Sequence, residues 1–198
     1  MSKVTAIVLA AGLSRRMGQP KMLLPWGGTT VLGQVVRTLH NVGADELIVV
    51  SGGAREQVEA QVMRLKSDGL PVRAIFNPQH ESGDMISSIR AGLAETGPET
   101  QFALIALGDQ PQLSPESARR VLSAAARPDS RLVLPSFEMR RGHPWLVERT
   151  LWPALMRAES GRAFLRAHEH EIFYVETDET VLKDLDTPED YQQGLNML

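Results

Sequence analysis

Short apolar runs alternate with amphipathic segments along the first two thirds of the chain. Runs of strand length that are rich in apolar and β-branched residues lie at residues 4–9, 47–50, 72–76, 102–107 and 132–134. Strands buried on both faces of a parallel sheet have such continuous runs, rather than alternating polar and apolar positions. Because segments with a helical apolar period separate the runs, the pattern predicts a doubly wound α/β fold.

The helical segments are defined by apolar residues that recur every three or four positions. The sets that share a face are Val31, Val35, Leu39 and Val42; Val58, Val62 and Leu65; Met85, Ile89 and Leu93; and Val121, Leu122 and Ala125. Gly43 suits the C-terminal cap of the first helix. Ser114 followed by Pro115 predicts the start of a helix over 115–126.

The last third of the chain has a less regular pattern. It predicts a strand near 142–147, helices around 151–157 and 161–167, short strands at 172–175 and 181–185, and a final helix that begins at Thr187-Pro188-Glu189. No linker rich in proline, glycine or serine divides the sequence. We therefore expect residues 1–198 to form one domain, a Rossmann-like three-layer sandwich with a mostly parallel sheet.

Composition excludes several classes of function. The 198 residues contain no cysteine, which rules out disulfides, thiol nucleophiles and cysteine-ligated metals. No apolar run approaches the ~18–20 residues of a membrane span, and the start of the sequence lacks the pattern of a secretory signal. A net charge of −3 weighs against general nucleic-acid binding. The expectation is a soluble cytoplasmic protein with no membrane or nucleic-acid partner.

The loop after the first predicted strand carries the strongest chemical signal. Leu9 is followed by the small residues Ala10, Ala11 and Gly12, which let the backbone approach a ligand closely. The backbone N–H groups of such a loop can bind phosphate oxygens, and Arg15, Arg16 and Lys21 add positive charge. An ordinary solvated loop is the alternative. The position after the first strand favours a ligand site, because open α/β sheets bind ligands at the carboxyl ends of their strands.

The spacing in this loop differs from two common phosphate-binding motifs. Five residues separate Gly12 from Gly18, and Gln19-Pro20 precede Lys21, so the loop is not a P-loop. No third glycine stands at the spacing of the dinucleotide-binding motif.

Two aspartates are candidate ligands of a magnesium ion. Asp109 directly follows the apolar run 102–107 and should lie at the carboxyl edge of the sheet, although a turn aspartate before a helix is the alternative. Carboxylate oxygens are ligands that Mg²⁺ shares with substrate phosphates. If 181–185 is a strand, Asp184 and Asp186 share one of its faces. Asp186 or Thr187 could instead cap the last helix.

The run from Leu9 to Pro25 resembles the signature L-A-A-G-x-S-x-R-M-G-x-x-K-x-L-L-P of the MobA-like nucleotidyltransferases. The similarity continues at 108–111, 142–144 and 186–188, and it is greatest to the molybdenum-cofactor cytidylyltransferase branch. This resemblance implies a fold like that of the nucleotide-diphospho-sugar transferases. It also implies that the loop binds the nucleotide through Leu9, Ala10, Ala11, Gly12, Arg16, Gly18 and Lys21.

Further site residues follow from the same resemblance. It implies nucleotide contacts at Gly83 and Ser87 and a Mg²⁺ site at Asp109 and Asp186. Asp84 stands where relatives often have glycine, so GTP stays open beside CTP. His143, in a Gly-His-Pro segment, is a candidate for contacting the acceptor, although a lone histidine is also a common structural residue.

The function that the resemblance implies is the transfer of a nucleotidyl group. A phosphorylated acceptor, molybdopterin by preference, attacks the α-phosphorus of a nucleoside triphosphate and displaces pyrophosphate. Arg16, Lys21 and Asp109 are the expected catalytic residues, CTP is favoured, and a molybdoenzyme or chaperone is a possible partner. The alternatives are a guanylyltransferase of the same cofactor, a sugar-phosphate nucleotidyltransferase, a nucleotide hydrolase, and a non-catalytic nucleotide-binding cofactor carrier.

Overall fold

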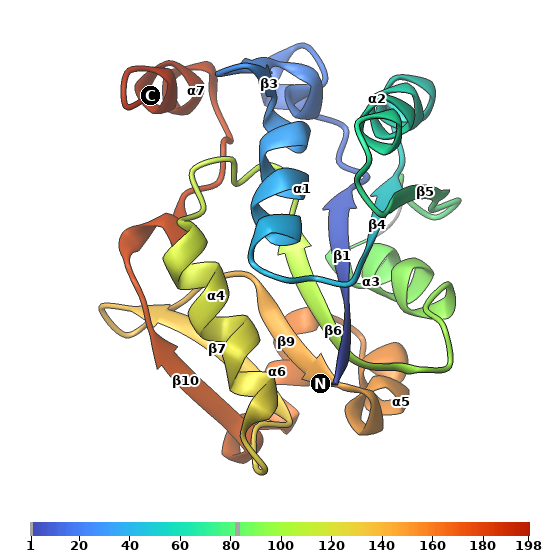
Figure 1. Cartoon of the computed structure of the whole chain (residues 1–198), viewed down its shortest axis with the longest axis vertical. Coiled ribbons are helices and arrows are strands. Elements are labelled where there is room, and N and C mark those ends of the chain that lie inside the picture. The colour runs from blue at the N-terminus through green and yellow to red at the C-terminus, as the bar shows by residue number, and fades with distance from the viewer. Residues whose placement is uncertain (1, 82–83) are drawn as a thin grey trace.

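A mixed β-sheet forms the centre of the molecule, as a computed structural model describes it for residues 2–81 and 84–198 (Figure 1). Within these residues the strand order is β5-β4-β1-β6-β9-β7-β10, and β8 pairs with β7. The strands are β1 (Lys3–Ala10), β4 (Glu46–Ser51), β5 (Val72–Phe76), β6 (Thr100–Leu107), β7 (Leu132–Phe137), β8 (Arg140–Arg141), β9 (Trp145–Glu148) and β10 (Ile172–Glu176). A separate hairpin joins β2 (Pro25–Trp26) and β3 (Thr29–Thr30).

Most neighbouring strands of the sheet run parallel. The pairs β1–β4, β1–β6, β4–β5 and β7–β10 are parallel, whereas β9 is antiparallel to both β6 and β7. The prediction of a mostly parallel sheet is therefore confirmed. The five predicted apolar runs form β1, β4, β5, β6 and β7, as expected.

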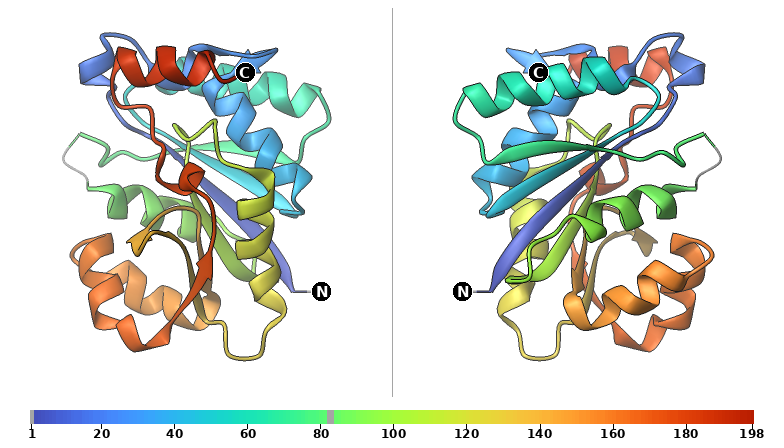
Figure 2. Two further views of the ribbon diagram at one scale, coloured as in Figure 1. Left: turned by 90° about the vertical axis from the view of Figure 1, so that its left-hand side faces the viewer. Right: turned by 90° about the vertical axis from the view of Figure 1, so that its right-hand side faces the viewer.

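Helices cover both faces of the sheet (Figure 2). Helices α1 (Val31–Asn41), α2 (Arg55–Ser67) and α4 (Pro115–Ser123) pack on one face, and α3 (Met85–Ala94), α5 (Trp152–Arg157) and α6 (Gly161–Ala167) pack on the other. Alternate side chains of β1 divide between the two cores: Val4, Ala6 and Val8 lie in the first, Ile7 and Leu9 in the second. This arrangement confirms the three-layer prediction.

The helix ends follow the expected local chemistry. Ser114 caps α4 by accepting a hydrogen bond from the backbone N–H of Ser117. Helix α4 ends at Ser123, and a 3₁₀ turn continues to Ala126, which together cover the helix predicted over 115–126. Gly43 follows α1 with a φ of +110°, a conformation in which glycine costs the least.

The strand predicted at 181–185 is wrong. The chain forms a 3₁₀ helix there (Glu179–Leu182) and then crosses the end of β6 as an irregular segment. The carbonyl of Val181 accepts hydrogen bonds from the Gln110 side chain and the His143 backbone, not from a neighbouring strand. Val181 and Leu185 are buried because they cover the core, which explains the apolar pattern without a strand.

The final helix α7 (Pro188–Leu195) lies beyond the carboxyl end of the sheet, beside the β2–β3 hairpin (Figure 1). A small third core of Met17, Leu24, Trp26, Val31 and Leu185, with Tyr191 and Leu195 packed against it, joins these elements. The loop after β1 and the C-terminal segment are thus held at the same end of the molecule.

The direction of chain travel changes between β1 and β6. From β1 the chain moves to β4 and β5 on one side, and it then returns to β6 on the other side of β1. Leu9 pairs with Leu107 at the carboxyl ends of these two strands, and the loops that follow them diverge. Such a switch point opens a crevice in which doubly wound sheets bind ligands.

Close backbone packing supports the start of the loop after β1. Gly52, at the end of β4, lies against Ala11, and a Cβ atom on Gly52 would overlap the carbonyl oxygen and Cα of Ala11. The neighbouring Gly53 N–H donates a hydrogen bond to the Ala11 carbonyl at 3.4 Å. Glycine at position 52 therefore allows the loop to approach β4.

No described helix combines the length and apolar character that crossing a bilayer requires.

The substitution Gly52→Ala should lower the free energy of unfolding by about 1–3 kcal/mol, because the methyl group must displace the Ala11 backbone. Urea denaturation measures this change. Gly28→Ala is the matched control: no atom lies within 4 Å of its added Cβ, and its effect should stay within about 0.5 kcal/mol. Equal stability of the two variants would contradict the close approach.

Candidate active site

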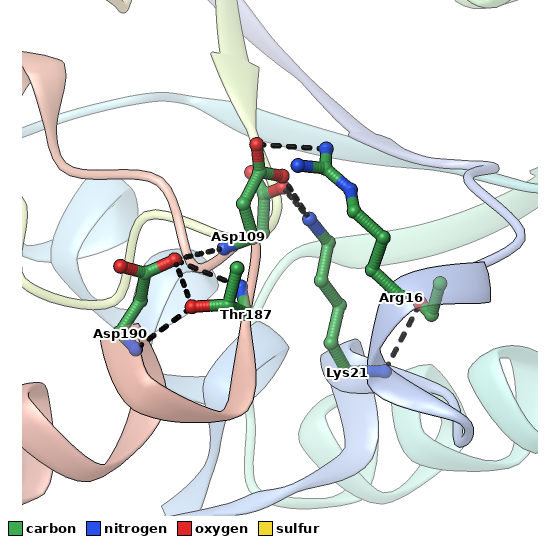
Figure 3. Close-up of polar contacts among 7 residues, drawn as sticks. Arg16, Lys21, Asp109, Thr187 and Asp190 are labelled. Atoms are coloured by element: carbon green, nitrogen blue, oxygen red, sulfur yellow. Dashed lines mark hydrogen bonds and ion pairs between the residues drawn. The ribbon is translucent and has the colours of Figure 1, made fainter.

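The loop after β1 folds back on itself through two short 3₁₀ turns, Arg15–Met17 and Lys21–Leu23. Ser14 (φ +48°) and Gly18 (φ +65°) have left-handed backbone conformations on either side of the first turn. The backbone N–H of Lys21 donates to the Ser14 hydroxyl at 3.1 Å, which closes the loop. Arg16 and Lys21 consequently extend toward the carboxyl ends of the strands (Figure 3).

These two cations meet two carboxylates from distant parts of the chain. The Nζ atom of Lys21 lies 2.5 Å from an Asp109 carboxylate oxygen and 3.2 Å from one of Asp186. Arg16 contacts the second oxygen of Asp186 at 2.9 Å. The Lys21 and Asp109 side chains are only 11% and 14% exposed, whereas that of Arg16 is 68% exposed. The site therefore has a buried ion pair at its base and an exposed guanidinium at its rim.

The surrounding charges shift two pKa values. Burial by itself lowers the pKa of Lys21, but the charges and hydrogen bonds of Asp109 and Asp186 outweigh it, and the net pKa is raised. Partial burial raises the pKa of the Asp184 carboxyl, and the negative charges of Asp109 and Asp186 raise it further. Lys21 is thus fully protonated at neutral pH, beside an excess of negative charge.

Thr187, and not Asp186, is the N-cap of α7. The Thr187 hydroxyl accepts a hydrogen bond from the backbone N–H of Asp190, whose carboxylate accepts from the backbone N–H groups of Thr187 and Asp186. This capping box leaves the Asp186 carboxylate free to contact Arg16 and Lys21. The Leu185 N–H also donates to the Asp109 carbonyl at 3.0 Å, which ties this segment to the end of β6.

Asp109 and Asp186 suit a magnesium ion that is shared with substrate. Their carboxylates converge on one ammonium group, so they are close enough to contact a common cation. Among the described residues no group of three or more His, Cys, Asp or Glu side chains forms a complete metal cage. Magnesium characteristically takes one or two carboxylates and completes its coordination with water and substrate phosphates. The donor set fits that pattern.

A cavity of about 550 Å³ opens above these charges. Seven of the residues singled out in the sequence line it: Leu9, Ala11, Gly12, Arg16, Lys21, Asp109 and Asp186. Ala10 lies buried beneath the loop, and Gly18 is exposed outside the cavity lining, where it turns the chain. The structure thus brings the predicted loop and both aspartates together.

The start of α3 forms the opposite end of this cavity. Ser87 is buried, and its hydroxyl contacts the Asp84 carbonyl and the Asn77 amide, whereas Ser88 lines the cavity. Asp84 lines it too, together with His80 and Glu81. The sequence prediction selected Ser87 from this segment and did not select Ser88, which is the serine that lines the cavity. Gly83 lies outside the described residues.

A second cavity, of about 750 Å³, adjoins the first through Asp84 and Met85. Its other lining residues are Arg141, His143, Trp145, Ser160, Gly161, Arg162 and Leu165. The His143 ring stacks on Trp145 with centroids 4.7 Å apart and planes 14° from parallel. Burial lowers the pKa of His143 to about 4, so the imidazole is neutral at physiological pH.

The second cavity also contains residues that the sequence did not single out. Gly161 lies against Trp145 and Met85. A Cβ atom at this position would lie 3.0 Å from the Trp145 ring and 3.1 Å from the Met85 methyl group, so a side chain would crowd both. Arg162 contributes an exposed positive charge at the start of α6. The sequence signal for this side of the second cavity is the Gly-Arg pair at the start of α6.

Comparison with known proteins gives the family. The MobA-like NTP transferase domain matches residues 6–172. Nicotine blue oxidoreductase of Paenarthrobacter nicotinovorans is 34% identical, with 94% of this chain and 93% of that protein aligned. Molybdenum cofactor cytidylyltransferase of Escherichia coli is 30% identical over 96% of this chain and 95% of its own length.

Solved structures agree with this relationship. Rv0371c from Mycobacterium tuberculosis superposes with a TM-score of 0.83 at 30% identity, with 98% of each chain covered, and a second structure of it contains manganese. The match over 6–172 and these nearly full-length similarities, on a chain whose charged residues converge at the switch point, show that it belongs to the MobA-like NTP transferase family of nucleotidyltransferases and is related to the molybdenum cofactor cytidylyl- and guanylyltransferases.

Proposed function

We propose that the chain, as one domain over residues 1–198, transfers a cytidylyl group from CTP to a phosphorylated acceptor of the molybdopterin type and releases pyrophosphate. The observation that carries this proposal is the convergence of Arg16 and Lys21 with Asp109 and Asp186 beneath one cavity. The similarity to the cytidylyltransferase of E. coli, at 30% identity over 96% of the chain, supports the substrate pair.

The reaction needs positioning and charge neutralisation more than a strong base. The acceptor phosphate is already ionised, and its oxygen forms a bond to the α-phosphorus while the bond from that phosphorus to the β-phosphate oxygen breaks. Lys21 and Arg16 donate hydrogen bonds to the phosphate oxygens and stabilise the charge on the departing pyrophosphate. Asp109 and Asp186 would hold Mg²⁺, which supplies further charge neutralisation when bound.

The opposite end of the first cavity suits a base with an exocyclic amino group. If the phosphates contact the loop after β1, the base extends toward Glu81, Asp84 and Ser88. Carboxylates accept hydrogen bonds from the amino group of cytosine. Guanine also has amino and imino donors, so a guanylyltransferase is the alternative that the same side chains would serve.

The second cavity is the proposed acceptor site. It shares Asp84 and Met85 with the first cavity, so an acceptor bound there would lie directly beside the nucleotide. The neutral His143 ring, supported by Trp145, offers a surface for a planar heterocycle, while Arg141 and Arg162 supply positive charge for its anionic group. Cytoplasmic synthesis, followed by transfer of the product to a molybdoenzyme or its chaperone, completes the proposal.

A redox activity is the second candidate, since a relative that is 34% identical over most of the chain is named an oxidoreductase. The sequence lacks the three-glycine dinucleotide motif in its first loop. The paired carboxylates and cations suit phosphoryl chemistry better than hydride transfer. Oxidation of NADH or NADPH is the assay that separates the two.

Pyrophosphate release with Mg²⁺ tests the function directly. Each of CTP, GTP, ATP and UTP is assayed with and without a molybdopterin acceptor, and release is expected only with CTP and the acceptor together. Release with GTP would make the chain a guanylyltransferase. Release without acceptor would indicate hydrolysis, and tight nucleotide binding with no release under any condition would indicate a carrier.

Asp109→Asn should reduce turnover by at least about a hundredfold, because it removes charge from the magnesium site and the main partner of Lys21. Pyrophosphate release measures the loss, and circular dichroism verifies the fold. Asp129→Asn, an exposed aspartate in the turn before β7, is the matched control and should keep wild-type turnover. Wild-type activity of Asp109→Asn would exclude the metal assignment.

His143→Gln should flatten the pH dependence of stability. With a folded-state pKa of about 4, below the ~6.5 of the unfolded chain, His143 takes up its proton preferentially in the unfolded state. The free energy of unfolding therefore decreases as the pH falls from about 6.5 towards 4, by about 2 kcal/mol between pH 7 and pH 5. Urea denaturation of both proteins at these pH values measures the difference, and parallel profiles would contradict a buried neutral imidazole.

A further inference from the structure

We propose that the ammonium group of Lys21 takes the place of the metal ion between Asp109 and Asp186 before substrates bind, and that it moves to the triphosphate when the metal enters. Metal and nucleotide would then bind cooperatively, because each ligand favours the same displaced position of one side chain. This inference rests on the proposed metal-dependent transfer.

The contacts of Lys21 place it where the metal belongs. A single Nζ atom contacts both carboxylates, at 2.5 Å from Asp109 and 3.2 Å from Asp186. Arg16 reaches only Asp186 and stays largely exposed, so it does not occupy the space between the two acids. Lys21 is thus the cation that a metal ion would have to displace from both ligands.

Charge explains why a cation is needed there without a metal. Asp109 and Asp186 both contact the Lys21 ammonium group, and Asp184 adds a third carboxylate nearby, whose pKa is raised by burial and further by their negative charges. Lys21 offsets this repulsion, and its own burial is tolerated because of the pairing. The ligand-free site is held together by an internal cation.

Metal binding and the present position of Lys21 exclude each other. A bound Mg²⁺ or Mn²⁺ needs the same carboxylate oxygens at about 2 Å, and the ammonium cannot remain between them beside a divalent charge. The backbone of Lys21 is fixed through the Ser14 hydroxyl, so the movement falls to the flexible four-carbon side chain. Lys21 lines the first cavity, and in that cavity its ammonium group would donate hydrogen bonds to the phosphate oxygens of a bound nucleotide.

The energetic consequence is reciprocal. A metal ion alone must displace Lys21 with no new partner for the ammonium, so it binds weakly. A nucleotide supplies that partner and strengthens metal binding, and by linkage the metal strengthens nucleotide binding by the same factor. Removal of the Lys21 charge should therefore tighten binding of the metal alone and weaken binding of the nucleotide.

Titration with Mn²⁺ alone, followed by electron paramagnetic resonance, tests this inference without turnover. Lys21→Met should bind Mn²⁺ about tenfold more tightly than the wild type, whereas its affinity for CTP, measured by calorimetry, should fall. Lys66→Met, which removes an exposed charge on α2, is the matched control and should change neither affinity. Equal or weaker Mn²⁺ binding by Lys21→Met would overturn the inference.

A double variant locates the added metal affinity. Asp109→Asn in the Lys21→Met background should abolish the tighter Mn²⁺ binding, and its persistence would overturn the inference because the ion would lie elsewhere. The Mn²⁺ titrations require neither an acceptor nor a nucleotide. A chain that fails to release pyrophosphate but passes them refutes the proposed function alone.

A measurement on the wild-type chain covers the case in which Lys21→Met does not fold. Saturating Mn²⁺ without nucleotide should increase acylation of Lys21 by an amine-reactive reagent several-fold, as mass spectrometry quantifies, because the ammonium leaves its carboxylate partners. Lys66 provides the internal reference. Unchanged or lower modification of Lys21 would overturn the inference.

Discussion

The buried ion pair between Lys21 and Asp109 is the interaction on which the site depends. Each side chain is almost fully covered, and an unpaired charge at that depth would be strongly destabilising. The loops after β1 and β6 must therefore keep a fixed relative position. The pairing of Leu9 with Leu107 sets that position at the level of the sheet, and the N–H of Gly108 continues it by donating to the Leu9 carbonyl.

The C-terminal segment contributes a second carboxylate to this ion pair. Asp186 comes from the far end of the sequence, yet it completes the cluster because the Leu185 N–H is bonded to the Asp109 carbonyl and Thr187 begins α7 immediately afterwards. Packing of Leu185 and Tyr191 around Trp26 holds this segment against the loop that carries Arg16 and Lys21. Three separate parts of the chain thus constrain four charged side chains.

The sequence predicted the elements that depend on local pattern and failed where tertiary contacts decide. The five apolar runs became strands, and Asp109 followed its strand to the carboxyl edge as expected. Residues 181–185 include three apolar residues, but the Val181 carbonyl is bonded by Gln110 and His143, whose positions no local pattern gives.

The site showed the same division. The choice between Asp186 and Thr187 as the helix cap depended on where Asp190 points, and that of Ser87 or Ser88 on a rotation of about 100° along one helix. Both questions are geometric, because Asp and Thr are both good helix caps and the other two candidates are both serines. The sequence could therefore identify the segment but not the side chain that faces the cavity.

The arrangement of the two cavities explains how one family can include relatives named for different chemistry. The converging charges of the first cavity follow β1 and β6 and precede α7, whereas residues of β9, α6 and the start of α3 line the second cavity. Substitutions at Trp145, Gly161 or Arg162 would alter the second cavity without touching the ion pair of Lys21 and Asp109. Under the proposed assignment, such a fold retains its nucleotide chemistry while the acceptor changes, and the residues of the second cavity, not the fold, determine the identity of the acceptor.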